Sequence, residues 1–158
     1  MSRYEPAMRA ALAQAALAPA HGDVPVGAVL LDETGAVLAA AHNDRERAGD
    51  PTAHAELLTL RAGAAARGRW RLDGCTLVVT LEPCTMCAGA LVLSRVSRVV
   101  YGAVDPKAGA AGSLWDVLRD RRLNSRPEVV GGVLGQECGE VLREFFEQRR
   151  GQVLGDQG

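Results

Sequence analysis

The sequence has little lysine, no long apolar run and no excess of charge of either sign. Lys107 is the one lysine among 18 basic residues, and the formal net charge is −1. This net charge argues against a protein that binds nucleic acid indiscriminately through an overall positive surface. It is compatible with a local basic patch. No stretch approaches the ~20 apolar residues that span a bilayer, and the first six residues lack the basic-then-apolar order of a signal peptide. We therefore expect a cytoplasmic protein with no membrane partner.

Cysteine is also scarce, with four residues in the chain. In a reducing compartment, we expect the four cysteines to be metal ligands, redox groups or core residues rather than to form disulfides. The length of 158 residues and the hydrophobic fraction of 47% suit one globular domain with a sizeable core. Because no internal repeat or linker divides the chain, we predict a single domain over residues 1–150 and a flexible C-terminal tail over residues 151–158.

Hydrophobic periodicity and turn residues predict an initial helix and a hairpin, followed by strands that alternate with helices. Four predicted helices cover residues 6–17, 84–94, 113–123 and 137–150. A fifth is predicted between the first two of these; Asp50 or Thr52 would be its N-cap, and it should end near residue 66. The predicted strands cover residues 26–31, 36–41, 75–80, 99–103 and 129–134.

This order of elements predicts an α/β fold, a three-layer α/β/α sandwich with a central mixed five-stranded sheet. The sheet should be antiparallel at the hairpin and parallel afterwards, with helices on both faces. Folds of this kind place their chemistry at the carboxyl ends of strands, where helices begin.

Two short motifs lie at predicted helix starts. The first is His54-Ala55-Glu56, and the second is Pro83-Cys84-Thr85-Met86-Cys87. Each alone is weak evidence, because a lone histidine near a helix start is more often structural. A Cys-x-x-Cys pair after a strand is also typical of a thioredoxin-like redox site.

Together the motifs predict a metal site with one open position. Cys84 and Cys87 share the first turn of a helix, so both sulfurs can bind one ion, and the helix dipole favours their thiolates. His54 would be the third protein ligand of a zinc ion, which leaves a fourth position for a water whose pKa falls to roughly 7. Glu56 lies beside this ligand without being one, so it can act as the catalytic proton shuttle.

The other cysteines and histidines receive no metal role. Cys75 begins an apolar strand and Cys138 lies in a helical segment, so we expect both in the core. His21 and His42 lie in loops. A structural zinc site, which needs a fourth protein ligand but not Glu56, and a dithiol redox protein remain alternatives at this point.

The pairing of His-x-Glu with Pro-Cys-x-x-Cys resembles the signature of zinc-dependent base deaminases, which implies hydrolytic loss of ammonia. A more specific resemblance, to the bacterial tRNA-specific adenosine deaminases, extends from about residue 8 to residue 150. It rests on VPVGAV at 24–29, DPTAHAE at 50–56, TLEPCTMCAGA at 80–90, GAAGSL at 109–114, and the pairs Phe145-Phe146 and Arg149-Arg150. The zinc motifs are common to all nucleobase and nucleoside deaminases, whereas the last three features narrow the choice to the tRNA enzymes.

The resemblance implies a cytidine deaminase-like fold and conversion of adenosine to inosine at the wobble position of an arginine tRNA, in the anticodon loop. It also implies a homodimer with one zinc ion per subunit. By the same resemblance, Asn43 would hydrogen-bond the flipped base or its ribose, and Val26 would pack against the base. Asp105 and Lys107 match a loop near the flanking nucleotides.

A free-base or nucleotide deaminase, such as a guanine or cytosine deaminase, would share the zinc chemistry and is the nearest alternative. Asn43 and Asp105 could also be ordinary turn residues. Three arginine-rich groups could contact phosphates: Arg67, Arg69 and Arg71; Arg119, Arg121, Arg122 and Arg126; and Arg143, Arg149 and Arg150. The alternative for each group is that its arginines simply face solvent. For the last two groups, we favour partial contacts with tRNA.

Overall fold

The structure, a computed structural model, describes residues 2–155, with side chains to residue 152. The helices are α1 (Glu5–Ala15), the 3-10 turn η1 (Pro19–His21), α2 (Arg45–Ala48), α3 (Ala55–Arg67), α4 (Thr85–Leu93) and α5 (Gly135–Gly155). The strands are β1 (Gly27–Leu31), β2 (Val37–His42), β3 (Thr76–Leu81), β4 (Arg98–Ala103) and β5 (Glu128–Val130).

The five strands form one mixed sheet in the order β2-β1-β3-β4-β5. Strand β1 pairs antiparallel with β2 and with β3, whereas β3 with β4 and β4 with β5 are parallel. The sheet is therefore mixed at the hairpin and parallel afterwards, as predicted. Strand β1 is buried along its whole length because helices cover both faces, which is why its sequence is continuously apolar.

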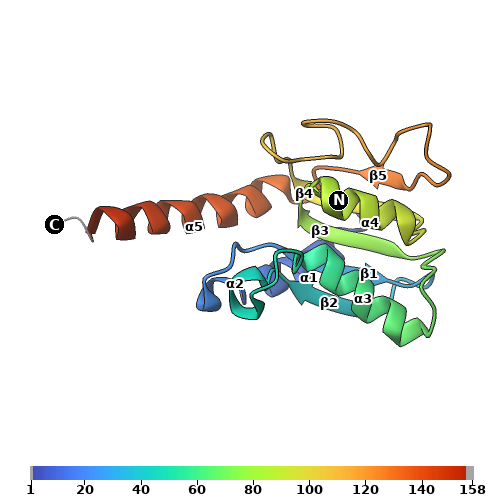
Figure 1. Ribbon diagram of the computed structural model, residues 1–158, viewed down its shortest axis with the longest axis horizontal. Helices are drawn as coiled ribbons and strands as arrows, with labels where there is room; N and C mark the ends of the chain where they lie inside the picture. Colours follow the sequence, from blue (N-terminus) through green and yellow to red (C-terminus); the bar gives the residue numbers. More distant parts are fainter. Residues whose placement is uncertain (1, 156–158) are drawn as a thin grey trace.

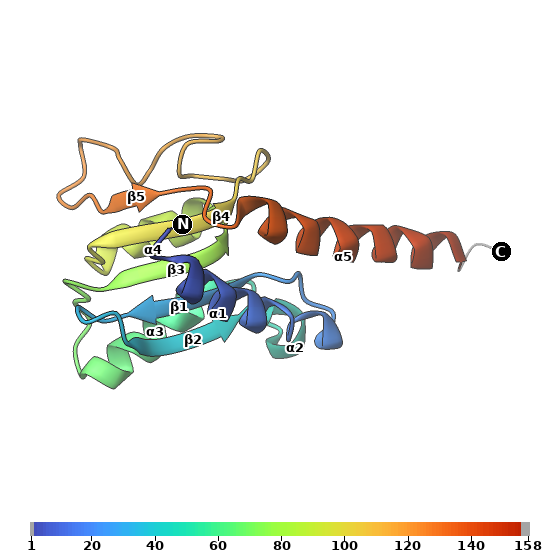
Figure 2. The same cartoon turned by 180° about the vertical axis from the view of Figure 1, so that it is seen from behind.

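Helices cover both faces of the sheet (Figures 1 and 2). Their buried side chains form one apolar cluster on each face. On one face, Leu60 of α3 and Leu91 of α4 pack with Leu30 and Leu77 of the sheet. On the other face, α1 and the first turn of α5 pack on alternate strand residues; the buried members of this layer are Met8, Ala11, Val29, Leu31, Val78, Val100, Val133 and Cys138. The alternation along β1 and β3 thus supplies both layers, which confirms the predicted three-layer sandwich.

Residues 113–123, predicted as a helix, are irregular, so that prediction is wrong. The segment folds back on the preceding residues. The N–H of Val117 donates to the carbonyl oxygen of Ala110 at 2.9 Å, and Ala111 forms an isolated β-bridge with Asp116. Leu118 is fully buried in the core as a result. Tertiary pairing has therefore overridden the local helical periodicity of this segment.

Two further predicted boundaries are wrong. Helix α3 begins at Ala55 rather than near residue 51, because the Asp50 carboxylate accepts hydrogen bonds from Thr52 within a turn, at 2.8 Å. His54 consequently becomes the N-cap of α3. Strand β5 ends at residue 130 rather than 134, where two consecutive glycines turn the chain toward α5.

Helix α5 projects well beyond the sheet, as both views show (Figures 1 and 2). Its first turns pack on the sheet through the buried side chain of Cys138. Residues 151–155, which we expected in a flexible tail, belong to this helix, and residues 156–158 of that tail lie outside the described residues. Within the described range, no helix is long and apolar enough to cross a membrane.

Candidate active site

His54 and Cys84 each occupy the position immediately before a helix. Both have extended backbones, with φ −80° and ψ 150° at His54 and φ −73° and ψ 175° at Cys84. His54 precedes α3, and Cys84 precedes α4, which follows directly from strand β3. Cys87 lies in the first turn of α4. The two helix N-termini therefore bring the predicted ligands together where the helix dipoles favour negatively charged groups.

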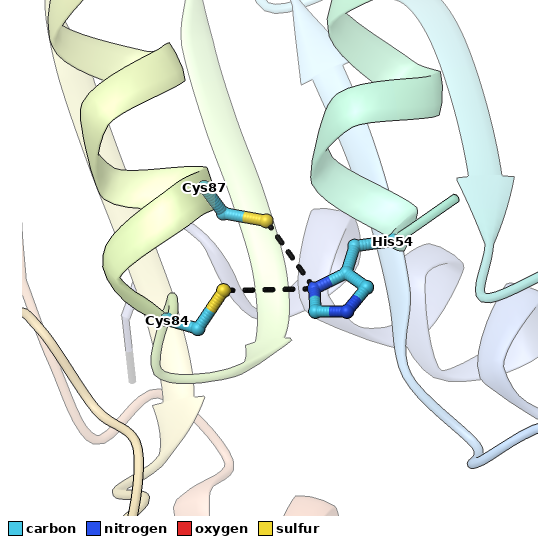
Figure 3. A group of neighbouring side chains, drawn as sticks. All are labelled: His54, Cys84 and Cys87. Carbon is cyan, nitrogen blue, oxygen red and sulfur yellow. Dashed lines mark hydrogen bonds between the residues drawn. The ribbon is translucent and has the colours of Figure 1, made fainter. Parts of the chain in front are cut away.

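The three predicted ligand atoms converge on one point (Figure 3). The Nδ1 atom of His54 lies 3.6 Å from the Cys84 sulfur and 3.5 Å from the Cys87 sulfur. All three donor atoms lie within 4.8 Å of one another. Around a tetrahedral zinc ion with Zn–S of about 2.3 Å and Zn–N of about 2.05 Å, sulfur and nitrogen would lie about 3.6 Å apart. The donor set therefore fits zinc in both chemistry and spacing.

The ionisation of the two cysteine thiols and of His54 also favours a bound cation. The pKa of the Cys84 thiol falls to about 4, because the Cys87 thiol donates a hydrogen bond to its thiolate. For the same reason, and because it is buried, the pKa of the Cys87 thiol rises above its ordinary value. The hydrogen bond with Cys84 raises the pKa of His54. The second thiol thus keeps its proton unless a metal ion compensates the charge of both sulfurs.

Glu56 is in the first turn of α3, two residues after His54, and only 4% of it is exposed. Burial raises the pKa of this carboxyl to about 7. A carboxyl with a pKa near neutrality can both accept and release a proton at neutral pH. Its position beside the ligands, lining the same cavity as His54 and Cys84, agrees with the predicted role of proton shuttle.

A cavity of about 1220 Å³ opens from the ligands, and all four predicted substrate-binding residues line it. Asn43 and Val26 are joined by a backbone hydrogen bond of 3.1 Å. The Asn43 side-chain oxygen accepts the Ala55 N–H at 2.9 Å, which leaves the side-chain NH2 as its donor group. Asp105 and Lys107 lie on the loop after β4. The structure brings these residues together, while their individual roles stay predictions.

The cavity also has a wall that was only partly expected from the sequence. Besides the predicted site residues, the cavity is lined by Val24, Arg45, Leu81, Glu82, Val104, Ala108, Leu142, Arg143, Phe146, Arg149, Arg150 and Gln152. Six of these are on α5, which extends past the end of the sheet (Figures 1 and 2). Arg149 holds this helix against the N-terminal part of the chain by donating to the carbonyl oxygen of Gly22 at 3.2 Å. Neither Arg45 nor Glu82 carries a signal that spacing alone could have separated from ordinary loop and strand-end residues.

His21, Asp23 and Asp44 form a second group of potential metal ligands. The Asp23 carboxylate accepts a hydrogen bond from the backbone N–H of Glu46 at 3.0 Å and contacts His21 Nδ1 at 2.6 Å. Asp44 pairs with the guanidinium of Arg47 at 2.8 Å. These carboxylates already have partners that hold the short helix α2 in place. That structural role accounts for their geometry.

Several of the arginines considered for phosphate contacts are paired with carboxylates. Arg67 pairs with Glu33 and Arg71 with Asp73, and Arg119 and Arg122 pair with Asp116 and Asp120; the four N–O distances lie between 2.6 and 2.9 Å. In the second group, Arg119, Arg121 and Arg126 line a separate hollow. In the third group, Arg143 pairs with Glu147 at 3.3 Å. This group differs from the other two because all three of its members line the cavity that His54 and Cys84 also line.

Comparison with known proteins agrees with this site. Residues 1–103 match the family described as the cytidine and deoxycytidylate deaminase zinc-binding region. The chain is 50% identical over 150 residues to a Bacillus subtilis protein named tRNA-specific adenosine deaminase, covering 95% of this chain and 92% of that one. A Haemophilus influenzae protein of the same name is 48% identical over 146 residues, which are 92% of this chain and 84% of its own length.

A solved structure shares the fold across most of the chain. It comes from a study of A-to-I editing by tRNA A34 deaminases at the wobble position, and its TM-score with this chain is 0.83 at 41% identity. The match covers 87% of this chain and 99% of the other. The similarity therefore extends from the metal motifs to nearly all of the sheet and helices.

The ligand assignment predicts that Cys84→Ala loses its metal. We expect about one zinc ion per chain in the purified protein and less than about a tenth of that in the variant, since two protein ligands hold zinc poorly. Atomic absorption of the purified protein measures this directly. Cys138→Ala is the matched control, because Cys138 is a buried thiol outside the site and its loss should leave the zinc content unchanged. Full zinc content in Cys84→Ala would contradict the assignment.

Proposed function

We propose that this chain, which belongs to the cytidine and deoxycytidylate deaminase family, converts adenosine to inosine at the wobble position of tRNA. It is a zinc-dependent deaminase, because the matched region is the family's zinc-binding region and His54, Cys84 and Cys87 provide the donor set. The observation that carries the choice of substrate is the 50% identity to a tRNA-specific adenosine deaminase over 95% of the chain.

Glu56 is the residue that moves protons in the proposed reaction. When zinc is bound by the three ligands, the chemistry that it supplies is Lewis acidity, which makes water a nucleophile at neutral pH. The Glu56 carboxylate accepts a proton from the attacking water. It delivers this proton to the ring nitrogen, then takes the proton of the hydroxyl group newly added to the base and passes it to the departing amino group, so that adenosine and water give inosine and ammonia. Its burial suits this work, because a pKa of about 7 lets the carboxyl accept and return a proton with little cost.

The substrate base would be held between Val26 and Asn43. Val26 offers an apolar surface at the cavity, and the free side-chain NH2 of Asn43 can donate to the base or its ribose. Asp105 and Lys107, on the opposite loop, would contact the flanking nucleotides. These four assignments rest on the family resemblance, and their shared cavity supports them.

The size and charge of the cavity favour a nucleic acid over a free base. Its volume of about 1220 Å³ exceeds the roughly 300–1,000 Å³ of ordinary small-molecule pockets. Arg143, Arg149 and Arg150 line it along α5, where they can neutralise phosphates. A base in an anticodon loop is already single-stranded, so extruding it costs less than opening a duplex. We propose an arginine tRNA as the substrate on the strength of the family resemblance.

The direct test offers the protein three substrates. We expect inosine from an arginine tRNA anticodon stem-loop with adenosine at the wobble position, and no product from guanine or cytosine. A matched stem-loop with its adenosine one position away from the wobble site should remain unmodified. Inosine and ammonia report the reaction. Turnover of guanine or cytosine without turnover of the wobble stem-loop would replace the proposal with a free-base deaminase.

We also propose that the chain works as a homodimer in the cytoplasm. Three large apolar side chains near the start of α4, Met86, Leu114 and Trp115, are exposed by 36%, 56% and 55%. The indole N–H of Trp115 donates to the Thr85 hydroxyl at 2.9 Å, so this surface is ordered. Exposed apolar side chains of this size favour burial against a second copy.

The molar mass in solution tests this proposal. Light scattering should give twice the 16.6 kDa of one chain. Trp115→Glu, which places a charge on the apolar surface, should shift the population toward the monomer. A 16.6 kDa particle at micromolar concentration would contradict the homodimer.

A further inference from the structure

Glu82 is a buried carboxylate that the proposed reaction does not use. It follows β3 directly, two residues before Cys84, and only 2% of it is exposed. Its oxygens accept hydrogen bonds from the backbone N–H groups of Asp105, Ala111 and Ser113, at 3.0, 3.0 and 3.1 Å, and from the Ser113 hydroxyl. All four donors lie in one segment, residues 105–113, so the Glu82 side chain is hydrogen-bonded to both ends of this loop.

The 105–113 loop also contacts the residues immediately before α4. The N–H of Ala110 donates to the carbonyl oxygen of Pro83 at 2.8 Å, and Gly109 forms an isolated β-bridge with Cys84. The fit around Glu82 is close. A Cβ atom at Gly109 would lie 2.4 Å from the Glu82 carboxyl carbon and 2.6 Å from the Asp105 carbonyl oxygen. The glycine therefore allows the loop to approach the carboxylate as closely as it does.

The same loop carries the residues that face the substrate cavity. Asp105, Lys107 and Ala108 line that cavity together with Glu82. The Asp105 side chain accepts the backbone N–H groups of Lys107 and Ala108 at 3.1 and 3.2 Å, which fixes the tip of the loop. The bonds to Glu82 fix the rest. Because hydrogen bonds to an ionised acceptor are stronger than neutral ones, this carboxylate restrains the loop more firmly than an amide could.

We propose that Glu82 is a positioning residue, which holds the 105–113 loop at a fixed place relative to the zinc ligands and so sets how Lys107 meets the substrate. Glu82 lies between the two parts that must be aligned, because its backbone leads into Cys84 and its side chain binds the loop. Both of its carboxylate oxygens are hydrogen-bonded to the loop, so we assign it no part in the proton transfer. The part of this inference that concerns substrate rests on the proposed function, whereas the restraint of the loop does not.

The first test measures the loop without substrate. In Glu82→Gln, an amide NH2 replaces one acceptor and faces backbone donors, so the amides of Ala111 and Ser113 should exchange with deuterium at least about tenfold faster. The amide of Val78, in the middle of β3, is the internal control and should be unchanged. If Glu82→Gln does not fold, Ser113→Ala removes only the hydroxyl donor and should give a smaller acceleration, about twofold. Unchanged exchange of the loop amides in the folded variant contradicts the proposal.

The second test is a double-mutant cycle on the wobble-adenosine stem-loop. Glu82→Gln should lower kcat/KM about tenfold, mainly through a higher KM, with zinc content unchanged. In a Lys107→Ala background, the same change should cost only about twofold, because the loop residue that Glu82 positions is already absent. An equal or greater loss in that background contradicts the proposal. If the unmodified protein does not deaminate the stem-loop at all, the proposed function fails, and the exchange experiment still decides the role of Glu82.

Discussion

Two thiol sulfurs and an imidazole nitrogen within 4.8 Å of one another are the constraint on which the rest of the site depends. Both sulfurs lie at the N-terminus of α4, and His54 lies at the N-terminus of α3, so two helix dipoles favour negative charge at one point. The hydrogen bond between the two thiols lowers the pKa of Cys84 and raises that of Cys87, so a cation favours the doubly ionised pair. Zinc meets this requirement, and three protein ligands leave it one position for chemistry.

The remaining walls of the cavity are arranged around that point by elements far apart in the sequence. Val26 lies immediately before strand β1, α5 supplies arginines, and the loop after β4 supplies Lys107. The extended, cationic part of the cavity accounts for a polymeric substrate, and Glu82 accounts for the fixed relation between the loop and the zinc ligands.

Much of the fold and the chemical part of the site could be predicted from the sequence, for physical reasons. Strand and hairpin periodicity predicted the mixed sheet, and the i, i+3 spacing of Cys84 and Cys87 predicted a shared ion. The helix predicted over residues 113–123 was wrong because hydrogen bonds to Ala110 and Ala111 replace those of a helix. Glu82 could not have been singled out, since its four donors lie 23 to 31 residues away and only the folded chain brings them together.

The most direct test of the zinc-dependent deaminase mechanism is the zinc content and turnover of Glu56→Gln. The substitution keeps the shape of a side chain that is 4% exposed and leaves His54, Cys84 and Cys87 untouched, so zinc should stay at about one ion per chain. Deamination of the wobble-adenosine stem-loop should fall at least about a hundredfold, because the amide of glutamine cannot take up and return the proton as the Glu56 carboxyl does. Turnover within a few-fold of the unmodified protein, at full zinc content, would contradict the role of Glu56.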